Sequence, residues 1–151
     1  MTKAWGPCTW FVFHTLAEKI KEDNFPLIKN SLISMIKRIC SNLPCPECAG
    51  HAQQKMGTLN VNSIQTKRDL QMMLLSFHNE VNQRVGNPVF TEKQMDDKYK
   101  TANTLSIVQY FLQTWQKPNP NPKLLTTSLH KGQVIKEFIS WWNTNHIHFY
   151  A

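Results

Sequence analysis

Apolar residues recur every three or four positions along most of the chain, and no stretch alternates apolar with polar residues as a half-buried strand does. In residues 7–21, one helical face carries Trp10, Phe13, His14, Ala17 and Ile20. A second apolar stripe begins near Pro26, a residue favoured in the first turn of a helix, and ends before Pro44. The pattern therefore predicts two amphipathic helices in this part of the chain.

The same periodicity predicts five further helices. Their expected ranges are 45–57, 69–85, a brief helix after Thr91, 103–115 and 127–143. Gly86-Asn87-Pro88 predicts a turn after the fourth helix, and Thr91 with Gln94 three residues later resembles a capping box. Helices joined by short connections favour an all-α fold, a helix bundle.

Three prolines at alternate positions within residues 117–122 predict an extended, semi-rigid spacer. The helix beyond it is rich in apolar residues, Trp141 and Trp142 among them, and we expect it to dock on the bundle or on another subunit. We therefore divide the chain into a bundle domain, residues 1–101, and a C-terminal helical extension, residues 102–151.

Composition narrows the function classes. The chain has 151 residues, 41% of them hydrophobic, which is enough for one domain with a real core. Its five glycines are too far apart for a Gly-rich phosphate loop, and no apolar run is long enough to span a membrane. With no clean signal peptide, we expect a soluble intracellular domain. The formal charge of +7 is spread along the chain, so we expect no specific nucleic-acid binding.

Cys45 and Cys48 form a C-x-x-C motif at the start of a predicted helix. The first turn brings both sulfurs within bonding reach, and the helix N-terminus stabilises a thiolate, which suits dithiol–disulfide chemistry. Two alternatives stay open. The cysteines could bind zinc with His51 and a fourth ligand such as His146 or His148, or they could be buried structural thiols.

A second group of polar residues lies on the helix predicted for residues 69–85. His78 and Asn82 are four positions apart and share a face, with Asn79 beside them. An imidazole ring with two amides suits an adenine and a ribose or pyrophosphate better than it suits a core. Trp10 and His14 have the same spacing on the first helix, where alone they indicate core aromatic residues.

Three motifs together resemble the Erv/ALR family of FAD-linked sulfhydryl oxidases. They are Trp5-Gly6-Pro7 with Trp10 and His14, Pro44-Cys45-Pro46-Glu47-Cys48 with His51, and His78-Asn79-Glu80-Val81-Asn82. The Trp5-Gly6-Pro7 opening and the compact, glycine-poor chain are most similar to the branch of the family encoded by large cytoplasmic DNA viruses. The resemblance implies a four-helix bundle with a short fifth helix, FAD at the mouth of the bundle, a homodimer and no metal.

The resemblance also implies roles for individual residues. Cys48 is the flavin-proximal cysteine and Cys45 the outer cysteine that meets the substrate. The implied cofactor-binding residues are Trp5, Trp10, His14 and His51 on the flavin side and His78, Asn79, Val81, Asn82 and Tyr99 on the adenine side. The sequence departs from the family at the arginine and the lysine that it commonly carries, where Gly6-Pro7 and Gly86-Asn87-Pro88 stand, so Arg84 or Lys98 is the candidate cation for the pyrophosphate.

Cys8 and Cys40 begin the first helix and end the second. Three alternatives stay open for them: separate buried thiols, a disulfide if the two helix ends meet, or a pair that relays electrons to Cys45. No cysteine follows Cys48, so the pair that staples the C-terminal part of cellular members of the family cannot form.

The resemblance implies an enzyme that oxidises protein thiols, through a thioredoxin-like carrier, and passes electrons by way of FAD to O₂ to give H₂O₂. Its expected location is the cytoplasm, which for a viral protein is the host cytoplasm or the virion. The alternative is a non-enzymatic, zinc-stabilised helical adaptor that binds a protein or nucleic-acid partner.

Overall fold

The computed structural model describes residues 5–117 and 125–151, and side chains for these ranges except 125–129. Its α-helices are α1 (Trp5–Lys19), α2 (Phe25–Cys40), α3 (Pro46–Gly57), α4 (Lys67–Val85), α5 (Glu92–Lys100), α6 (Thr104–Trp115) and α7 (Leu125–Asn145). Short 3₁₀ turns occupy Glu22–Asn24, Val61–Ser63 and His146–His148. Over these two ranges the only β-pairing is an isolated bridge between Ile20 and Phe149. The predicted all-α class is confirmed.

The helix ends follow local chemistry. The Thr91 capping box is present as expected, and Gly86 ends α4 with a φ of 81°, a left-handed conformation that favours glycine. The helix α4 begins two residues before its predicted start, because the Thr66 hydroxyl accepts a hydrogen bond from the Asp69 amide in a second capping box.

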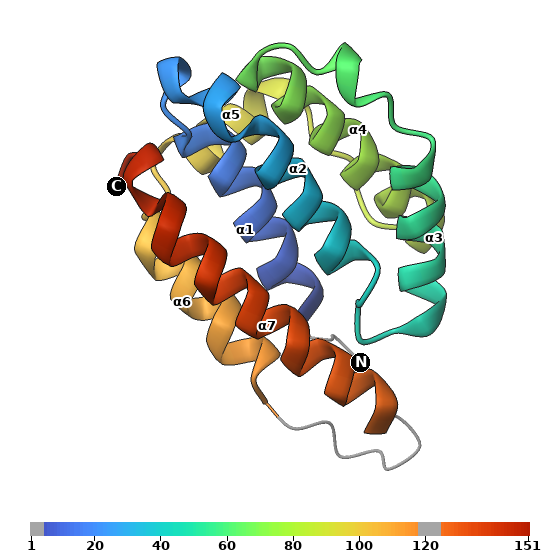
Figure 1. Cartoon of the computed structure of the whole chain (residues 1–151). Helices are drawn as coiled ribbons and strands as arrows, with labels where there is room; N and C mark the ends of the chain where they lie inside the picture. Colours follow the sequence, from blue (N-terminus) through green and yellow to red (C-terminus); the bar gives the residue numbers. More distant parts are fainter. Residues whose placement is uncertain (1–4, 118–124) are drawn as a thin grey trace.

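The helix α1 lies in the middle of the molecule, where it contacts α4, α5 and α6 (Figure 1). The helix α2 contacts α3 and α7. Helices α1 to α4 with the short α5 match the expected bundle. The α6–α7 pair lies on the side of α1 away from α3 and α4 (Figure 1). None of the helices within the described ranges is both long and apolar enough to cross a membrane.

The C-terminal extension docks on the bundle of the same chain. Phe111, Trp115 and Phe138 are at most 1% exposed and belong to the same core cluster as α1 and α2. At the surface of this contact, Arg38 donates to a Glu137 carboxylate oxygen at 2.7 Å. The predicted domain boundary at residue 101 comes directly after the end of α5. Both parts contribute to one core, and the division into two domains stays a prediction. The predicted spacer lies, apart from Lys117, outside the described residues.

The helix α1 is buried on more than its predicted face. Cys8, Val12 and Thr15 are fully buried as well, where α6 packs. Two hydrogen bonds hold the residues after α7 against the end of α1, from the Lys21 amide to the His148 carbonyl at 2.8 Å and from the Tyr150 amide to the Lys19 carbonyl at 2.7 Å. The extension is therefore an integral layer of the fold.

Candidate functional site

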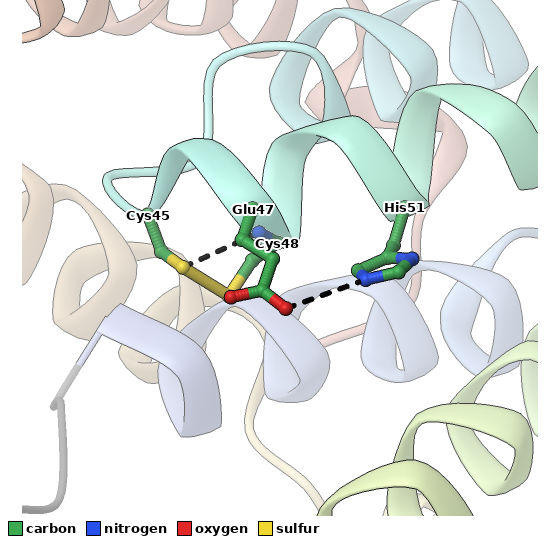
Figure 2. The surroundings of a disulfide bond; sticks show 4 residues. All are labelled: Cys45, Glu47, Cys48 and His51. Atoms are coloured by element: carbon green, nitrogen blue, oxygen red, sulfur yellow. Dashed lines mark hydrogen bonds and ion pairs between the residues drawn. A yellow bond between two sulfur atoms is a disulfide. The ribbon is translucent and has the colours of Figure 1, made fainter.

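The two cysteines of the C-x-x-C motif form a disulfide at the N-terminus of α3 (Figure 2). Cys45 is the extended N-cap residue, and Pro46 opens the helix, where its missing N–H costs nothing. This geometry brings the two Cα atoms to 5.1 Å, and the Cys48 amide donates to the Cys45 sulfur at 3.3 Å. The sequence therefore places a disulfide where a helix N-terminus stabilises a thiolate upon reduction.

In this structure the two sulfurs of the zinc alternative are bonded to each other. Across residues 5–117 and 130–151, no three His, Cys, Asp or Glu side chains are grouped as a metal site requires. His146 and His148 belong to the turn that follows α7, and the His148 carbonyl pairs with Lys21 at the far end of α1.

A cavity of about 370 Å³ lies beside the disulfide. Its walls come from α1, α3, α4 and the end of α2, and consist of Trp5, Gly6, Thr9, Trp10, Phe13, Cys40, Leu43, Glu47, Cys48, His51, Ala52, Phe77, Val81, Arg84 and Val85. Cys48 lines the cavity and Cys45 does not, so the disulfide has an inner and an outer sulfur. The cavity volume lies within the range of small-molecule and cofactor sites.

The lining is mainly aromatic and aliphatic, with two charged groups of opposite sign. Glu47 pairs with His51 one turn along α3, at 3.7 Å between Oε1 and Nε2, beside the disulfide (Figure 2). Arg84 enters from α4 and has no ion-pair partner among the described side chains. The cavity thus offers flat apolar walls and one free cation, which suits a planar ring joined to an anionic group.

A cluster of stacked rings adjoins the cavity. Trp10, which lines the cavity, lies parallel to His78 with ring centroids 4.0 Å apart. His78 Nδ1 is 2.9 Å from His14 Nε2, and His14 stacks on Tyr99 at 4.7 Å. Three predicted site residues from α1, α4 and α5 are therefore in one aromatic cluster with Trp10, although only Trp10 of the four lines the cavity.

Burial keeps both histidines neutral. It lowers the pKa of His14 to about 3, with smaller contributions from His78 and Lys98. Burial, assisted by Lys98, also lowers the pKa of His78 to about 4. The Nδ1 atom of His14 is buried without a hydrogen-bond partner. The pair is therefore neutral, hydrogen-bonded and buried at physiological pH.

Lys98 lies over the ring of Tyr99, a member of this cluster, and over two neighbouring phenylalanine rings. Its Nζ atom is 4.5 Å from the Phe11 ring centroid and 5.1 Å from that of Phe90, both within cation–π range. Burial lowers the pKa of Lys98 and raises that of Tyr99. Of the two predicted pyrophosphate cations, Arg84 lies at the cavity and Lys98 at the histidine cluster.

The two asparagines of the α4 motif have structural contacts. The Asn79 amide donates to the Phe90 carbonyl at 2.8 Å and accepts from the Phe90 amide at 2.9 Å, which holds the loop after α4. Asn82 is buried and donates to Asn79 at 3.5 Å. Neither lines the cavity, whereas Val81 does. Their cofactor-binding roles stay predictions.

Cys8 and Cys40 are separate buried thiols, so that alternative is confirmed over the disulfide. Burial raises the pKa of Cys8 to about 11 and that of Cys40 to about 12, which keeps both protonated and unreactive. Cys40 nevertheless lines the cavity from the end of α2.

Several wall residues were not among the predicted site residues, namely Gly6, Thr9, Phe13, Cys40, Leu43, Glu47, Ala52, Phe77 and Val85. A signal for part of this set was present, since Phe77, Val81 and Val85 recur every four positions on α4. The same periodicity describes a residue facing the core, so it could not distinguish a cavity wall from packed interior.

Comparisons with known proteins agree with this geometry. Residues 7–100 match the Erv1 / Alr family. A protein of Invertebrate iridescent virus 6 that is assigned as a FAD-linked sulfhydryl oxidase is 29% identical over 102 residues, covering 64% of this chain and 92% of its own. The FAD-linked sulfhydryl oxidase of African swine fever virus (isolate Tick/Malawi/Lil 20-1/1983) is 26% identical over 115 residues, covering 74% and 95%.

A cellular relative matches over less than half of its own length. The mitochondrial FAD-linked sulfhydryl oxidase erv1 of Schizosaccharomyces pombe is 27% identical over 86 residues, which cover 56% of this chain and 47% of that protein. No solved structure matches the chain significantly.

Proposed function

The chain belongs to the Erv1 / Alr family, and from this we propose that it is an FAD-linked sulfhydryl oxidase whose Cys45–Cys48 disulfide oxidises protein thiols. The observation that carries the proposal is the position of Cys48 in the wall of an aromatic cavity, with Cys45 outside it. Electrons that enter at an accessible sulfur are thereby delivered to the inner one, beside the place for a flavin.

The cavity fits the flavin half of FAD. Trp5, Trp10 and Phe77 supply flat apolar walls, and Arg84 supplies a cation for the pyrophosphate. As the family resemblance implies, we assign the adenine side to His78, Asn79, Val81, Asn82 and Tyr99, and keep His14 on the flavin side, where it hydrogen-bonds His78. Lys98 lies over the Tyr99 ring of the same region. When bound, FAD accepts two electrons from a dithiol and supplies the redox chemistry with the final acceptor.

The cysteines perform the exchange in two displacements. A client thiolate attacks the Cys45 sulfur, the Cys45–Cys48 bond breaks, and Cys48 leaves as a thiolate at the cavity wall. A second client thiol, deprotonated, attacks the mixed disulfide and releases the Cys45 thiolate. The client then holds the new disulfide, and Cys45 and Cys48 together hold the two electrons. The first-turn amides of α3, including that of Cys48, stabilise the thiolate form.

Glu47 and His51 lie at the cavity, beside the disulfide. They pair beside the disulfide and line the cavity with Cys48, so they form the polar rim of an otherwise apolar wall (Figure 2). We assign His51 to this rim.

We also propose three partners for the enzyme. They are a thioredoxin-like carrier as the immediate thiol substrate, O₂ as the acceptor that is reduced to H₂O₂, and a second copy in a homodimer. Because α6 and α7 cover one side of α1 and α2, the second copy would pair through another face. The viral relatives support an origin in a large DNA virus. We propose that the protein is located in the host cytoplasm or the virion.

The test is the visible spectrum of the purified protein, followed by oxygen uptake on addition of dithiothreitol. We expect a flavin absorbance maximum at about 450 nm and oxygen consumption that requires both the protein and the thiol. Heat-released cofactor, analysed by mass, identifies the flavin as FAD. A colourless protein that added FAD does not reconstitute would overturn the proposal.

A further inference from the structure

The C-terminal extension reaches the wall of the functional cavity. Trp115, the last residue of α6, is 1% exposed, and its indole Nε1–H donates to the Thr9 hydroxyl at 2.9 Å. Thr9 lines the cavity between Trp5 and Trp10 on α1. A residue outside the 7–100 family match is therefore bonded to a residue inside the cavity wall.

The bond to Thr9 continues to the beginning of α1. The Thr9 hydroxyl accepts from Trp115 and donates to the Trp5 carbonyl oxygen at 2.5 Å, so both its proton and a lone pair are used. The Cys8 thiol, next to Thr9, also donates to the Trp5 carbonyl, at 3.3 Å. Trp115 thus reaches the first turn of α1 through Thr9.

The first turn of a helix lacks the stabilisation of the interior, because its amides have no partners within the helix. In α1 this turn carries Trp5 and Gly6, which line the cavity. Any loosening of the turn changes the width of the cavity at this wall. The Trp115–Thr9 hydrogen bond is therefore located at the turn of α1 that lines the cavity.

We propose that Trp115 is a positioning residue for the cofactor site, which holds the Trp5–Thr9 turn of α1 in place through the Thr9 hydroxyl. This inference rests on the proposed function in that the cavity takes the flavin. The helix α6 would then brace the bundle from outside the 7–100 family match.

The chain offers a matched control for the test. On α7, Trp141 donates its indole Nε1–H to the Ser31 hydroxyl at 3.2 Å, and Ser31 donates to the Ile28 carbonyl of its own helix at 3.0 Å. The arrangement resembles that of Trp115, Thr9 and Trp5. In both, an indole N–H donates to a hydroxyl, and the hydroxyl donates to a carbonyl one turn earlier in its own helix. Neither Trp141 nor Ser31 lines the cavity beside the disulfide.

The experiment compares Trp115→Phe with Trp141→Phe in the full chain. Each change removes one indole N–H and leaves an aromatic ring. We expect Trp115→Phe to raise the FAD dissociation constant roughly threefold to tenfold, as for the loss of one hydrogen bond, and Trp141→Phe to leave it unchanged. Thr9→Val removes the same link from its other end, so adding it to Trp115→Phe should weaken FAD binding little further.

A second readout does not depend on the cofactor. Hydrogen exchange of the α1 amides in flavin-free protein should become faster in Trp115→Phe and stay unchanged in Trp141→Phe. Equal FAD affinity in the wild type and Trp115→Phe, or equal exchange, would overturn the brace. A wild-type protein that binds no FAD would instead overturn the proposed function, and the exchange experiment would still decide whether α6 holds the turn.

Discussion

Trp10 and His78 lie face to face, with ring centroids 4.0 Å apart and planes 6° from parallel. One ring comes from α1 and lines the cavity, and the other comes from α4 and bonds to His14. The stack therefore joins the cavity beside the disulfide to the buried histidine pair. A change in the charge or position of His78 acts on a wall of the cavity.

The histidine pair predicts a loss of stability in mild acid. Both folded-state pKa values, about 3 and about 4, lie below the ordinary value of 6.5, so below pH 6.5 the unfolded chain binds more protons than the folded one. Stability is thus complete above pH 6.5 and falls as the pH decreases toward the folded values. At about pH 5 the loss is on the order of 2 kcal/mol for each histidine.

Urea unfolding between pH 5 and pH 8 measures this loss. The variant His78→Gln keeps a neutral hydrogen-bonding group and should show about half of the wild-type acid dependence. His130→Gln is the control, because His130 is exposed on α7. An acid dependence in His78→Gln as steep as that of the wild type would contradict the assignment.

The two cysteines should behave differently toward the flavin. Cys45→Ser should lose oxidase turnover, retain FAD and leave Cys48 as a free thiol at the cavity wall, able to give a thiolate–flavin charge-transfer absorbance. Cys48→Ser should also be inactive and should lack that absorbance on partial reduction. The measurement is a reductive titration followed in the visible range. Full activity of Cys45→Ser would remove Cys45 from the exchange.

The C-terminal extension should unfold together with the bundle. Phe138 is fully buried in the core that α1, α2, α6 and α7 share, so Phe138→Ala should destabilise the whole chain by about 3–5 kcal/mol. Leu105→Ala is the control on the extension, since Leu105 is 56% exposed, and it should change stability by less than about 0.5 kcal/mol. A separate early transition confined to residues 104–151 would show an independent domain instead.

Two glycines should respond in opposite directions to the same change. Gly86 has a φ of 81°, so Gly86→Ala should destabilise the chain by about 1 kcal/mol through backbone strain. Gly132 lies within α7, and a Cβ there meets no atom within 4 Å, so Gly132→Ala should stabilise the chain by about 0.5–1 kcal/mol. Thermal unfolding of both variants checks the signs. Stabilisation by Gly86→Ala would contradict the left-handed cap.

Much of the secondary structure was predictable because its causes are local. Periodic apolar residues, Thr91 with Gln94 and the glycine at 86 specify helices and their ends through contacts within a few residues. The redox pair was predictable for the same reason, since Cys45 and Cys48 are one turn apart at a helix start. The helix α4 begins at Lys67 and not at the expected residue 69, because Thr66 and Asp69 form a capping box.

The cavity wall could only be predicted in part. Trp5, Trp10, Cys48, His51, Val81 and Arg84 were expected in the site and do line the cavity. Thr9 and Phe77 line it too, but their residue types and spacing equally suit a packed interior. Which side of a helix meets a void depends on how neighbouring helices cross, and that depends on the whole core.

The sequence by itself determined the helices, the chemistry of the Cys45–Cys48 pair and the family to which the motifs point, because each depends on residue types at short spacing. The tertiary structure alone decided that His14 and His78 pair as buried neutral rings and that Trp115 reaches Thr9. These contacts join residues 64 and 106 positions apart. They exist because the burial of apolar surface draws α4 and α6 onto α1.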